Sequence, residues 1–261
     1  MISRGGEDES THNEFAEQFC DVLKLLVNGN APLSTFHILR DNELITLPKP
    51  NGDVRPIGIG CTIRKLISIF ILRFTFKSCG NDHSYIEDDR DQGSNKLHFH
   101  TLQKGMDKLG AENIIHNLRA FSQLNPHKDI FLIDAHNAFN SASRNHGLQE
   151  ISKHFPHLLP FLSRIYAHAS KGWIFGQITV HHIESKEGYH QGDVLLSWLF
   201  CLTIQPLLLS LHSSIGSHEF LQFFIDDGNV AADHDNMLNF IQSVLDQGPE
   251  FGYNVNTSKS V

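Results

Sequence analysis

The stretch Phe223–Val230 has the sequence FFIDDGNV, in which two adjacent carboxylates follow an apolar run that begins at Phe220. Burying carboxylates costs free energy unless a partner compensates their charge, so an apolar strand does not carry two of them for stability. A divalent metal ion would be such a partner. The pair Asp227-Gly228 between two strand-like runs is equally a signal for a hairpin turn. A turn and a metal-ligand pair are therefore both open hypotheses for this stretch.

Composition limits the class of protein. The chain of 261 residues can form one large domain or two lobes. Its four cysteines form no Cys-x-x-Cys pair, which argues against zinc and disulfide frameworks and favours a reducing compartment. There is no signal-peptide layout, and polar residues interrupt every long apolar run. We predict an intracellular protein, nuclear or cytoplasmic, without membrane contact. The net charge of −8 argues against indiscriminate binding to nucleic acid, although a local basic groove is compatible with it.

A second apolar run also ends in a carboxylate. Residues 129–133 are apolar after Asp129 and lead to Asp134, the pattern of a buried strand, although Asp134 could be only a helix cap. If this strand lies beside the one that ends at Asp226, three carboxylates converge at one sheet edge. Such hard oxygen donors suit Mg²⁺, and two ions roughly 4 Å apart would clamp the attacking and leaving oxygens of a phosphoryl transfer. Because successive strand side chains point to opposite faces, Asp226 rather than Asp227 is expected to be the main ligand.

Hydrophobic periodicity and turn residues predict the other elements. Helices are predicted over residues 12–27, 62–77, 110–125, 145–170 (broken near Pro156 and Pro160), 194–212 and 236–247. Hairpins are predicted over 44–59, with Lys49 and Arg55 beside an Asn-Gly turn, and over 173–183. The loop 187–193 opens onto the helix at 194, where backbone N–H groups favour anions, although Asp193 could simply cap that helix. Residues 1–11 are predicted to be disordered.

The order of these segments resembles the reverse transcriptase domain of non-long-terminal-repeat retrotransposons and their group II intron relatives. The resemblance extends from about residue 44 to the end of the chain. Its segments are the fingers motif (47–59), a segment before the first palm motif (110–116), motif A (133–141), motif B (187–193), motif C (224–227) and motif D (252–259). The chain departs from the family at Val194 and Trp198, where prolines are usual.

The resemblance implies an α/β (α+β) fold: a polymerase palm, whose antiparallel sheet is backed by helices, plus a fingers subdomain. Fingers are expected over residues 12–125 and the palm over 126–261, with the 173–183 hairpin inside the palm. The last motif ends close to Val261, so we expect the thumb to be absent and to belong, with further domains, to a longer parent protein.

By position, the resemblance also assigns metal ligands. Asp134, Asp226 and Asp227 would hold two Mg²⁺ ions, for which Mn²⁺ can substitute, and the backbone carbonyl of Ala135 would assist. Lys259 would donate a proton to the pyrophosphate leaving group.

Other positions would bind the nucleotide. Phe139 would be the steric gate that excludes a ribose 2′-hydroxyl. Lys49 and Arg55 would contact the nucleotide phosphates, although the residues alone are equally compatible with two solvated cations. Gln191, with the backbone around Gly192, would position nucleotide and template.

The implied function is RNA-directed DNA polymerisation, in which a deoxynucleotide is transferred to the 3′-hydroxyl of a DNA or RNA primer on an RNA template. Two alternatives stay open. One is an inactive relic or co-opted nucleic-acid-binding module, which the acidic charge favours. The other is an RNA-directed RNA polymerase, against which Phe139 speaks, because such an enzyme needs room there for the 2′-hydroxyl.

Overall fold

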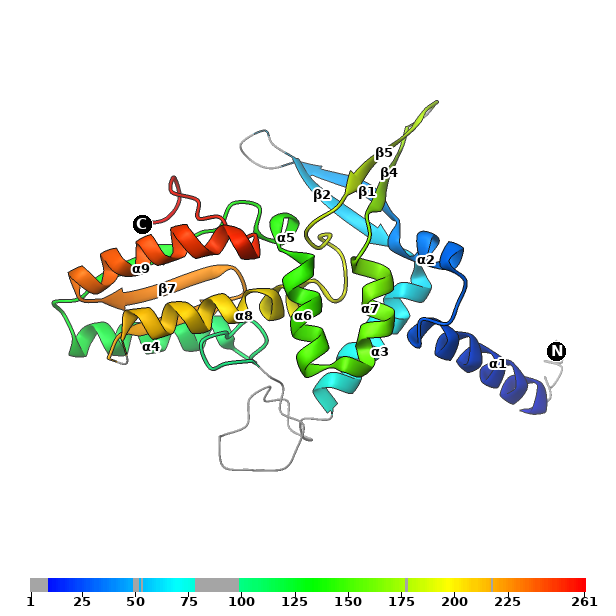
Figure 1. Cartoon of the computed structure of the whole chain (residues 1–261), viewed down its shortest axis with the longest axis horizontal. Helices are drawn as coiled ribbons and strands as arrows, with labels where there is room; N and C mark the ends of the chain where they lie inside the picture. Colours follow the sequence, from blue (N-terminus) through cyan, green and yellow to red (C-terminus); the bar gives the residue numbers. More distant parts are fainter. Residues whose placement is uncertain (1–8, 49–51, 53, 78–98, 177, 217) are drawn as a thin grey trace, which may run out of the picture.

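The structure is a computed structural model that describes residues 9–48, 52, 54–77, 99–176, 178–216 and 218–261. Within these residues the chain forms a three-stranded and a four-stranded sheet, surrounded and connected by helices (Figure 1). The predicted mixed α/β class is confirmed at this level.

The three-stranded sheet carries the acidic stretch. Its order is β3 (Asp129–Ile133), β7 (Asp227–Ala232), β6 (Phe220–Phe224), and both pairs are antiparallel. In this register Ile133 pairs with Gly228. The two strands that bring the carboxylates are therefore neighbours, as the sequence analysis required.

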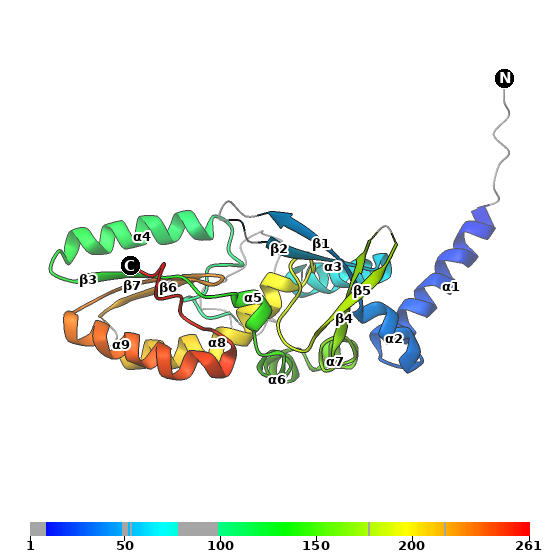
Figure 2. The ribbon, with the colours of Figure 1, turned by 90° about the horizontal axis from the view of Figure 1, so that it is seen from above.

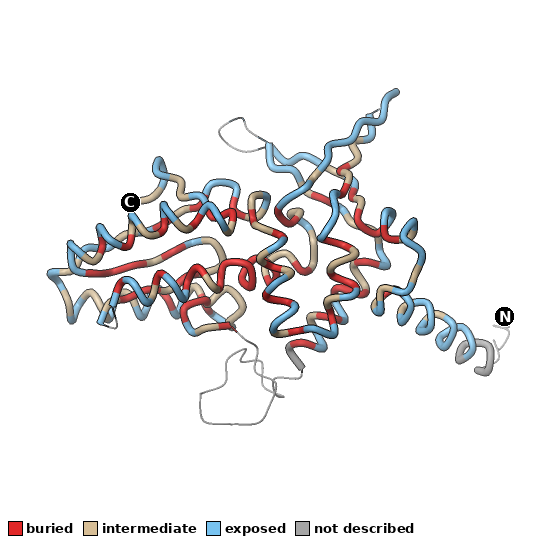
Figure 3. The backbone as a smooth tube through the Cα atoms, viewed as in Figure 1, coloured by how far each residue is buried: buried red, intermediate tan, exposed pale blue. Residues whose placement is uncertain are grey.

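Helices cover both faces of this sheet (Figure 2). Helix α4 (Gly110–Leu124) packs on β6 and β7 from one side, and α9 (His234–Gln247) lies on the other side with α8 (Leu196–Ile215) beside it. Helix α8 is the core helix, and it contributes many of the buried positions in Figure 3. By length and composition α8 could cross a membrane, but 67% of its apolar window is buried inside the fold.

Strand β3 is an edge strand, and the prediction that it is buried was wrong. Ile130 and Leu132 are 48% and 41% exposed, and only Ile133 is buried. Helix α4 lies over β6 and β7, so one face of β3 has little cover. Its outer edge is paired instead with the C-terminal segment: Leu132 and Val261 exchange two backbone hydrogen bonds of 2.6 and 3.0 Å.

The four-stranded sheet has the order β2 (Val54–Gly60), β1 (Asn42–Pro48), β4 (Ser170–Phe175), β5 (Val180–Ser185). Both hairpins predicted from the sequence are present, and β1 joins them into one sheet by a short parallel pairing with β4.

The β4–β5 hairpin was expected within the palm. It joins the sheet of the first hairpin and not the three-stranded sheet that carries the carboxylates, and its assignment to the palm stays a prediction. The Asp41 carboxylate accepts hydrogen bonds of 2.9 Å from the Lys171 N–H and the Trp173 indole, which holds β4 against β1. Gly172 permits this approach, because a Cβ there would lie 2.3 Å from Leu44 Cδ1. A local pattern predicts a hairpin but not the sheet that the hairpin joins. The division at residue 125 stays a prediction.

Most of the remaining helices lie where periodicity predicted them, whereas the short helices over Leu33–Arg40 and Ala138–Ser141 were not predicted. They are α1 (Glu9–Val27), α2 (Leu33–Arg40), α3 (Thr62–Lys77), α5 (Ala138–Ser141), α6 (Arg144–His154), α7 (Leu159–Tyr166) and the 3₁₀ turns Pro156–Leu158 and Gly248–Phe251. Helix α1 begins at Glu9, so residues 9–11 of the segment predicted as disordered are helical; the rest of it lies outside the described residues. Pro160 does not break α7 but occupies its first turn, where a missing N–H is tolerated.

Candidate functional site

The turn between β6 and β7 consists of Ile225 and Asp226, because Phe224 pairs with Asp227. The expected Asp-Gly turn was therefore placed two residues too late. Gly228 belongs to β7 instead, where a Cβ would lie 2.7 Å from the Phe223 ring. Ile225 has a φ of +57°, in the left-handed region that costs a β-branched residue on the order of 1–3 kcal/mol.

Three carboxylates share one electrostatic site at this end of the sheet. Asp226 is half-buried, and desolvation raises its pKa to about 6, with further contributions from the charges of Asp227 and Asp134. Asp227 is more exposed, and its pKa is raised by desolvation and then by Asp134. Asp226 and Asp227 are thus not equivalent, as expected. The cause differs from the predicted strand alternation, because Asp226 lies in the turn.

The C-terminal segment holds Asp134. Asn256 Nδ2 donates to Asp134 Oδ2 at 2.9 Å, and Lys259 Nζ lies 3.5 Å from the same oxygen. Ala135 and Val255 form an antiparallel bridge, in which the His136 N–H donates to the Asn254 carbonyl and the Asn256 N–H donates to the Asp134 carbonyl. Neither of these two hydrogen bonds uses the N–H or the C=O of Ala135. Lys259, the implied proton donor, thus lies beside Asp134, whereas the contact of Asn256 was not predicted although Asn256 lies within the last motif.

The chemistry of this donor set fits a divalent cation. Carboxylates at one sheet edge are the ligands that Mg²⁺ prefers. The pKa of Asp226 is raised first by desolvation and then by repulsion from Asp227 and Asp134, and a bound cation would relieve that repulsion. Among the described residues, however, no group of three or more His, Cys, Asp and Glu side chains stands close enough to hold one ion. The three carboxylates would therefore have to rotate toward a common ion.

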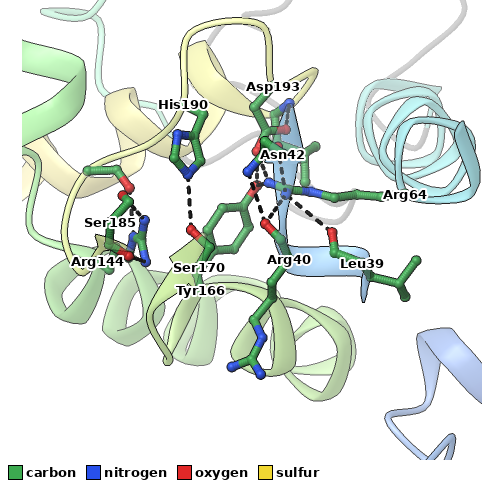
Figure 4. Close-up of polar contacts among 12 residues, drawn as sticks. Leu39, Arg40, Asn42, Arg64, Arg144, Tyr166, Ser170, Ser185, His190 and Asp193 are labelled. Carbon is green, nitrogen blue, oxygen red and sulfur yellow. Dashed lines mark hydrogen bonds and ion pairs between the residues drawn. The ribbon is translucent and has the colours of Figure 1, made fainter. Parts of the chain in front are cut away.

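Two buried arginines anchor the loop 187–193 (Figure 4). Arg144 Nε donates to the Gly188 carbonyl at 2.6 Å, and its Nη2 donates to Ser185 Oγ at 2.9 Å. Arg64 forms an ion pair with the Asp193 carboxylate, to which the Tyr166 hydroxyl also donates at 2.5 Å. Burial alone would lower the pKa of Arg64, but the charge of Asp193 raises it.

The Asp193 carboxylate has a third contact, because its Oδ1 accepts the Leu195 N–H at 3.0 Å. The proposed capping role is wrong, because the N-cap residue of α8 is Leu195 and no side-chain cap bond is formed there. Asp193 instead forms an ion pair that the sequence did not indicate, since Arg64 stood out only as one of several cations along its helix. Whether the start of α8 binds an anion stays a prediction.

Gln191 and Gly192 lie against the first hairpin. The Gly58 N–H donates to the Gln191 carbonyl at 2.6 Å. Gly192 has a φ of +103°, and a Cβ there would lie 2.6 Å from the Gly58 carbonyl oxygen, so only glycine allows this crossing. Beside them, His190 contacts Ser170 Oγ at 3.0 Å, and burial lowers its pKa to about 4. This histidine is therefore neutral near neutral pH.

Phe139 lies on the short helix α5 that follows Asp134. Its ring is 5.1 Å from the Phe200 ring of α8 in an edge-to-face contact, and its carbonyl accepts the Tyr189 N–H at 2.7 Å. The predicted gate residue is thus fixed to α8 by its ring and to the loop 187–193 by its backbone. Arg55 is exposed on β2, opposite Leu47. Lys49 lies outside the described residues.

Two buried side chains that the sequence analysis missed contact the acidic turn. The Gln103 amide binds both the N–H and the carbonyl of Ile225, and the Tyr253 hydroxyl donates to the Asp226 carbonyl at 2.7 Å. Gln103 lies in the polar stretch before α4 that gave no periodic signal.

Comparison with known proteins agrees with the motif order. The family described as reverse transcriptase (RNA-dependent DNA polymerase) matches residues 47–261. No curated protein matches the chain.

Several solved structures have a similar fold. Apo telomerase from Candida tropicalis aligns with a TM-score of 0.61 at 12% identity, over 97% of this chain and 49% of that one. Telomerase from Candida albicans, solved with a fragment of telomeric RNA, gives 0.58 at 14% identity, over 97% and 47%. The C. tropicalis enzyme truncated from its C-terminal domain gives 0.60 at 11% identity, over 85% and 50%. The chain thus spans about half the length of these structures, and at such identities the likeness concerns the fold alone.

Proposed function

This chain belongs to the reverse transcriptase family, and we propose that it catalyses RNA-directed DNA polymerisation, the transfer of a nucleotide from a deoxynucleoside triphosphate to a primer 3′-hydroxyl on an RNA template. The observation that carries the proposal is the common electrostatic site of Asp134, Asp226 and Asp227, which come from neighbouring strands. A solvated hairpin turn would not need a third carboxylate from another part of the chain.

The three carboxylates would hold divalent cations, Mg²⁺ or Mn²⁺, with help from the Ala135 carbonyl. When bound, such cations stabilise the charge that develops on the transferring phosphoryl group. The attacking group is the primer hydroxyl, so the protein needs no nucleophile of its own. Its residues contribute positioning and charge stabilisation.

Lys259 would protonate the pyrophosphate leaving group. Its ammonium group lies beside the carboxylates, 3.5 Å from Asp134 Oδ2. Because its side chain is 68% exposed, it can also turn toward a substrate. An ammonium at this place can also offset the negative charge of the triphosphate.

The nucleotide would lie between the carboxylates and the loop 187–193. Phe139 would exclude a 2′-hydroxyl, since its ring is held in place by Phe200. Gln191 and Gly192 would contact nucleotide and template, and their backbone is fixed against β2. Arg55 on the first hairpin, together with Lys49, would bind the nucleotide phosphates.

The origin of the chain is a further part of the proposal. The sequence motifs resemble those of non-long-terminal-repeat retrotransposons and group II introns, and we propose a retrotransposon-derived protein that works in the nucleus or cytoplasm. Its partners would be an RNA template and a DNA or RNA primer. One structural relative was solved with a fragment of telomeric RNA.

Primer extension on an RNA template with Mg²⁺ or Mn²⁺ tests the proposal. The wild-type protein should extend the primer with deoxynucleotides, and the Asp226→Asn variant should not. If the two proteins behave alike, the polymerase proposal is wrong; binding of primer-template without extension would then favour the non-catalytic alternative. Preferential use of ribonucleotides would favour the RNA polymerase alternative.

A further inference from the structure

The acidic turn has an unusual backbone that needs external support. Ile225 is one of three described non-glycine residues with a positive φ, and it is the only β-branched one. Such a conformation persists only where surrounding contacts over-determine it. The carboxylate of Asp226 follows directly, so the conformation of Ile225 decides where that carboxylate points.

Gln103 supplies this support. Its Oε1 accepts the Ile225 N–H at 2.9 Å, and its Nε2 donates to the Ile225 carbonyl at 3.0 Å. The same Oε1 accepts the Gly105 N–H at 2.8 Å. Two N–H groups on one oxygen define the orientation of the amide, because a flipped amide would set its NH₂ against both donors. Gln103 is 1% exposed, so water does not compete for these bonds.

The backbone around Gln103 is itself fixed to β6. The Phe223 N–H donates to the Leu102 carbonyl, and the Lys104 N–H donates to the Phe223 carbonyl, both at 2.7 Å. This short parallel pairing covers the outer edge of β6. Gly105 lets the segment approach, because a Cβ there would lie 2.5 Å from Ile225 Cγ1. The Gln103 amide therefore contacts the turn from a backbone segment that is itself held by hydrogen bonds to β6.

Tyr253 holds the next residue from another segment. Its hydroxyl donates to the Asp226 carbonyl at 2.7 Å, its side chain is 1% exposed, and its ring packs on Phe223 with centroids 6.0 Å apart. The N–H and C=O of Ile225 and the C=O of Asp226 are thus all bound by buried side chains distant in sequence.

We propose that Gln103, assisted by Tyr253, is a positioning residue that locks the left-handed backbone of Ile225 and so aims the Asp226 carboxylate at the metal ions. This inference rests on the proposed function for what Asp226 does, but the lock itself is a property of the fold. Neither side chain touches substrate. The alternative is that both residues satisfy buried backbone groups without influencing the carboxylate.

Two nearly isosteric variants separate these possibilities. Gln103→Met removes all three amide bonds with little change in volume, and Tyr253→Phe removes only the hydroxyl. Gln222→Met is the matched control, because Gln222 lies on strand β6 and, among the described residues, its amide accepts a hydrogen bond only from the exposed Asn117, at 3.4 Å. If Gln103→Met does not fold, Tyr253→Phe decides.

The first measurement is amide hydrogen exchange in peptides that cover residues 223–228. Both variants should exchange about tenfold faster or more in this turn, with unchanged exchange in α8 and α9, because only a local opening is promoted. Unchanged exchange in the turn, or an equal increase throughout the chain, would overturn the lock. This measurement requires neither metal nor activity, so it remains decisive even if the wild-type protein fails in primer extension.

The second measurement is the affinity for Mn²⁺ alone, followed by electron paramagnetic resonance. Loss of an outer partner of a ligand weakens metal binding by about 10- to 100-fold, and Gln103→Met should fall in this range while Gln222→Met matches the wild type. In extension assays kcat should fall at low Mg²⁺ and recover at high Mn²⁺, with little change in the deoxynucleotide KM. Faster exchange in the turn with unaltered Mn²⁺ affinity would refute the positioning role and leave a structural one.

Discussion

Arg64 and Asp193 form a buried ion pair that joins helix α3 to the loop before α8 across 129 positions of the sequence. The two side chains are only 5% and 3% exposed, and Tyr166, Asn42 and two backbone carbonyls complete their hydrogen bonds. The pair connects the start of the first hairpin, through Asn42, and helix α7, through Tyr166, to the loop 187–193, so it should decide how firmly that loop is held.

The first prediction concerns this pair. Arg64→Met should lower the free energy of unfolding by about 3–5 kcal/mol, because the carboxylate of Asp193 stays buried without its cation. Arg73→Met, at an exposed position of the same helix, should change it by less than about 0.5 kcal/mol. Urea unfolding of both variants provides the measurement. If the two variants lose similar amounts of unfolding free energy, the buried ion pair does not stabilise the fold more than an exposed arginine does.

A second prediction concerns glycine at the crossing of the loop and β2. Gly192→Ala should destabilise the fold by about 1–3 kcal/mol more than Gly216→Ala, because only the former overpacks against a backbone carbonyl. Both glycines have similar φ values, +103° and +98°, but a Cβ at Gly216 meets nothing within 4 Å. Thermal unfolding of the two variants measures the difference. Equal losses would place the cost in the backbone angle alone.

The third prediction follows from the raised pKa of Asp226, about 6 in the folded state. Between pH 4 and 6 the folded state holds this proton more tightly than the unfolded state, so stability falls as pH rises through this range and is level above it. Asp226→Asn should therefore stabilise the protein at pH 7 by about 1–2 kcal/mol, a value reduced for partial solvent screening. The gain should vanish near pH 4.

Chemical denaturation at a series of pH values checks this dependence. The control is Asp246→Asn, a change at an exposed carboxylate of α9 that should leave the pH profile unaltered. A gain from Asp226→Asn that is the same at pH 4 and pH 7 would contradict the assigned cause.

The fourth prediction tests the proposed gate. Phe139→Ala should raise ribonucleotide incorporation relative to deoxynucleotide incorporation by about 10- to 100-fold, because removal of the ring makes room for the 2′-hydroxyl. Phe121→Ala, which removes a half-buried ring from α4 on the opposite side of the sheet, is the control. Steady-state incorporation of matched nucleotide pairs gives the ratio, and an unchanged ratio in Phe139→Ala would rule out the gate.

The fifth prediction concerns the proposed proton donor. Lys259→Met should slow extension by about 10²- to 10⁴-fold, the range of general acid catalysis. Its exposed ion pair with Asp134 should contribute less than about 1 kcal/mol to stability. Lys186→Met is the control, since Lys186 forms a comparable exposed pair with Glu184 at 3.8 Å. A rate equal to that of the control would exclude Lys259 as the acid.

Much of the fold followed from local patterns alone. The apolar runs before Asp134 and Asp226 predicted two strands, and the spacing of apolar residues predicted α3 within its observed bounds. These predictions succeed because helix and strand periods are properties of a few consecutive residues. The arrival of the carboxylates at one end of the sheet also followed, on the single condition that the two strands pair, although the three side chains do not stand close enough to hold one ion.

What local patterns left open depends on contacts between distant segments. The apolar run of β3 is the same whether the strand is central or at an edge, and a hairpin such as β4–β5 can join either sheet. The turn lies at Ile225 and Asp226 and not at Asp227-Gly228 for two reasons. The Phe223 ring packs against Gly228, so that strand position has room only for glycine, and Gln103 and Tyr253 bind the strained backbone of the turn. Such partners are brought together only by the tertiary fold. Residue types therefore predicted candidate ligands, whereas the placement of these residues rests on packing and hydrogen bonds between segments far apart in the chain.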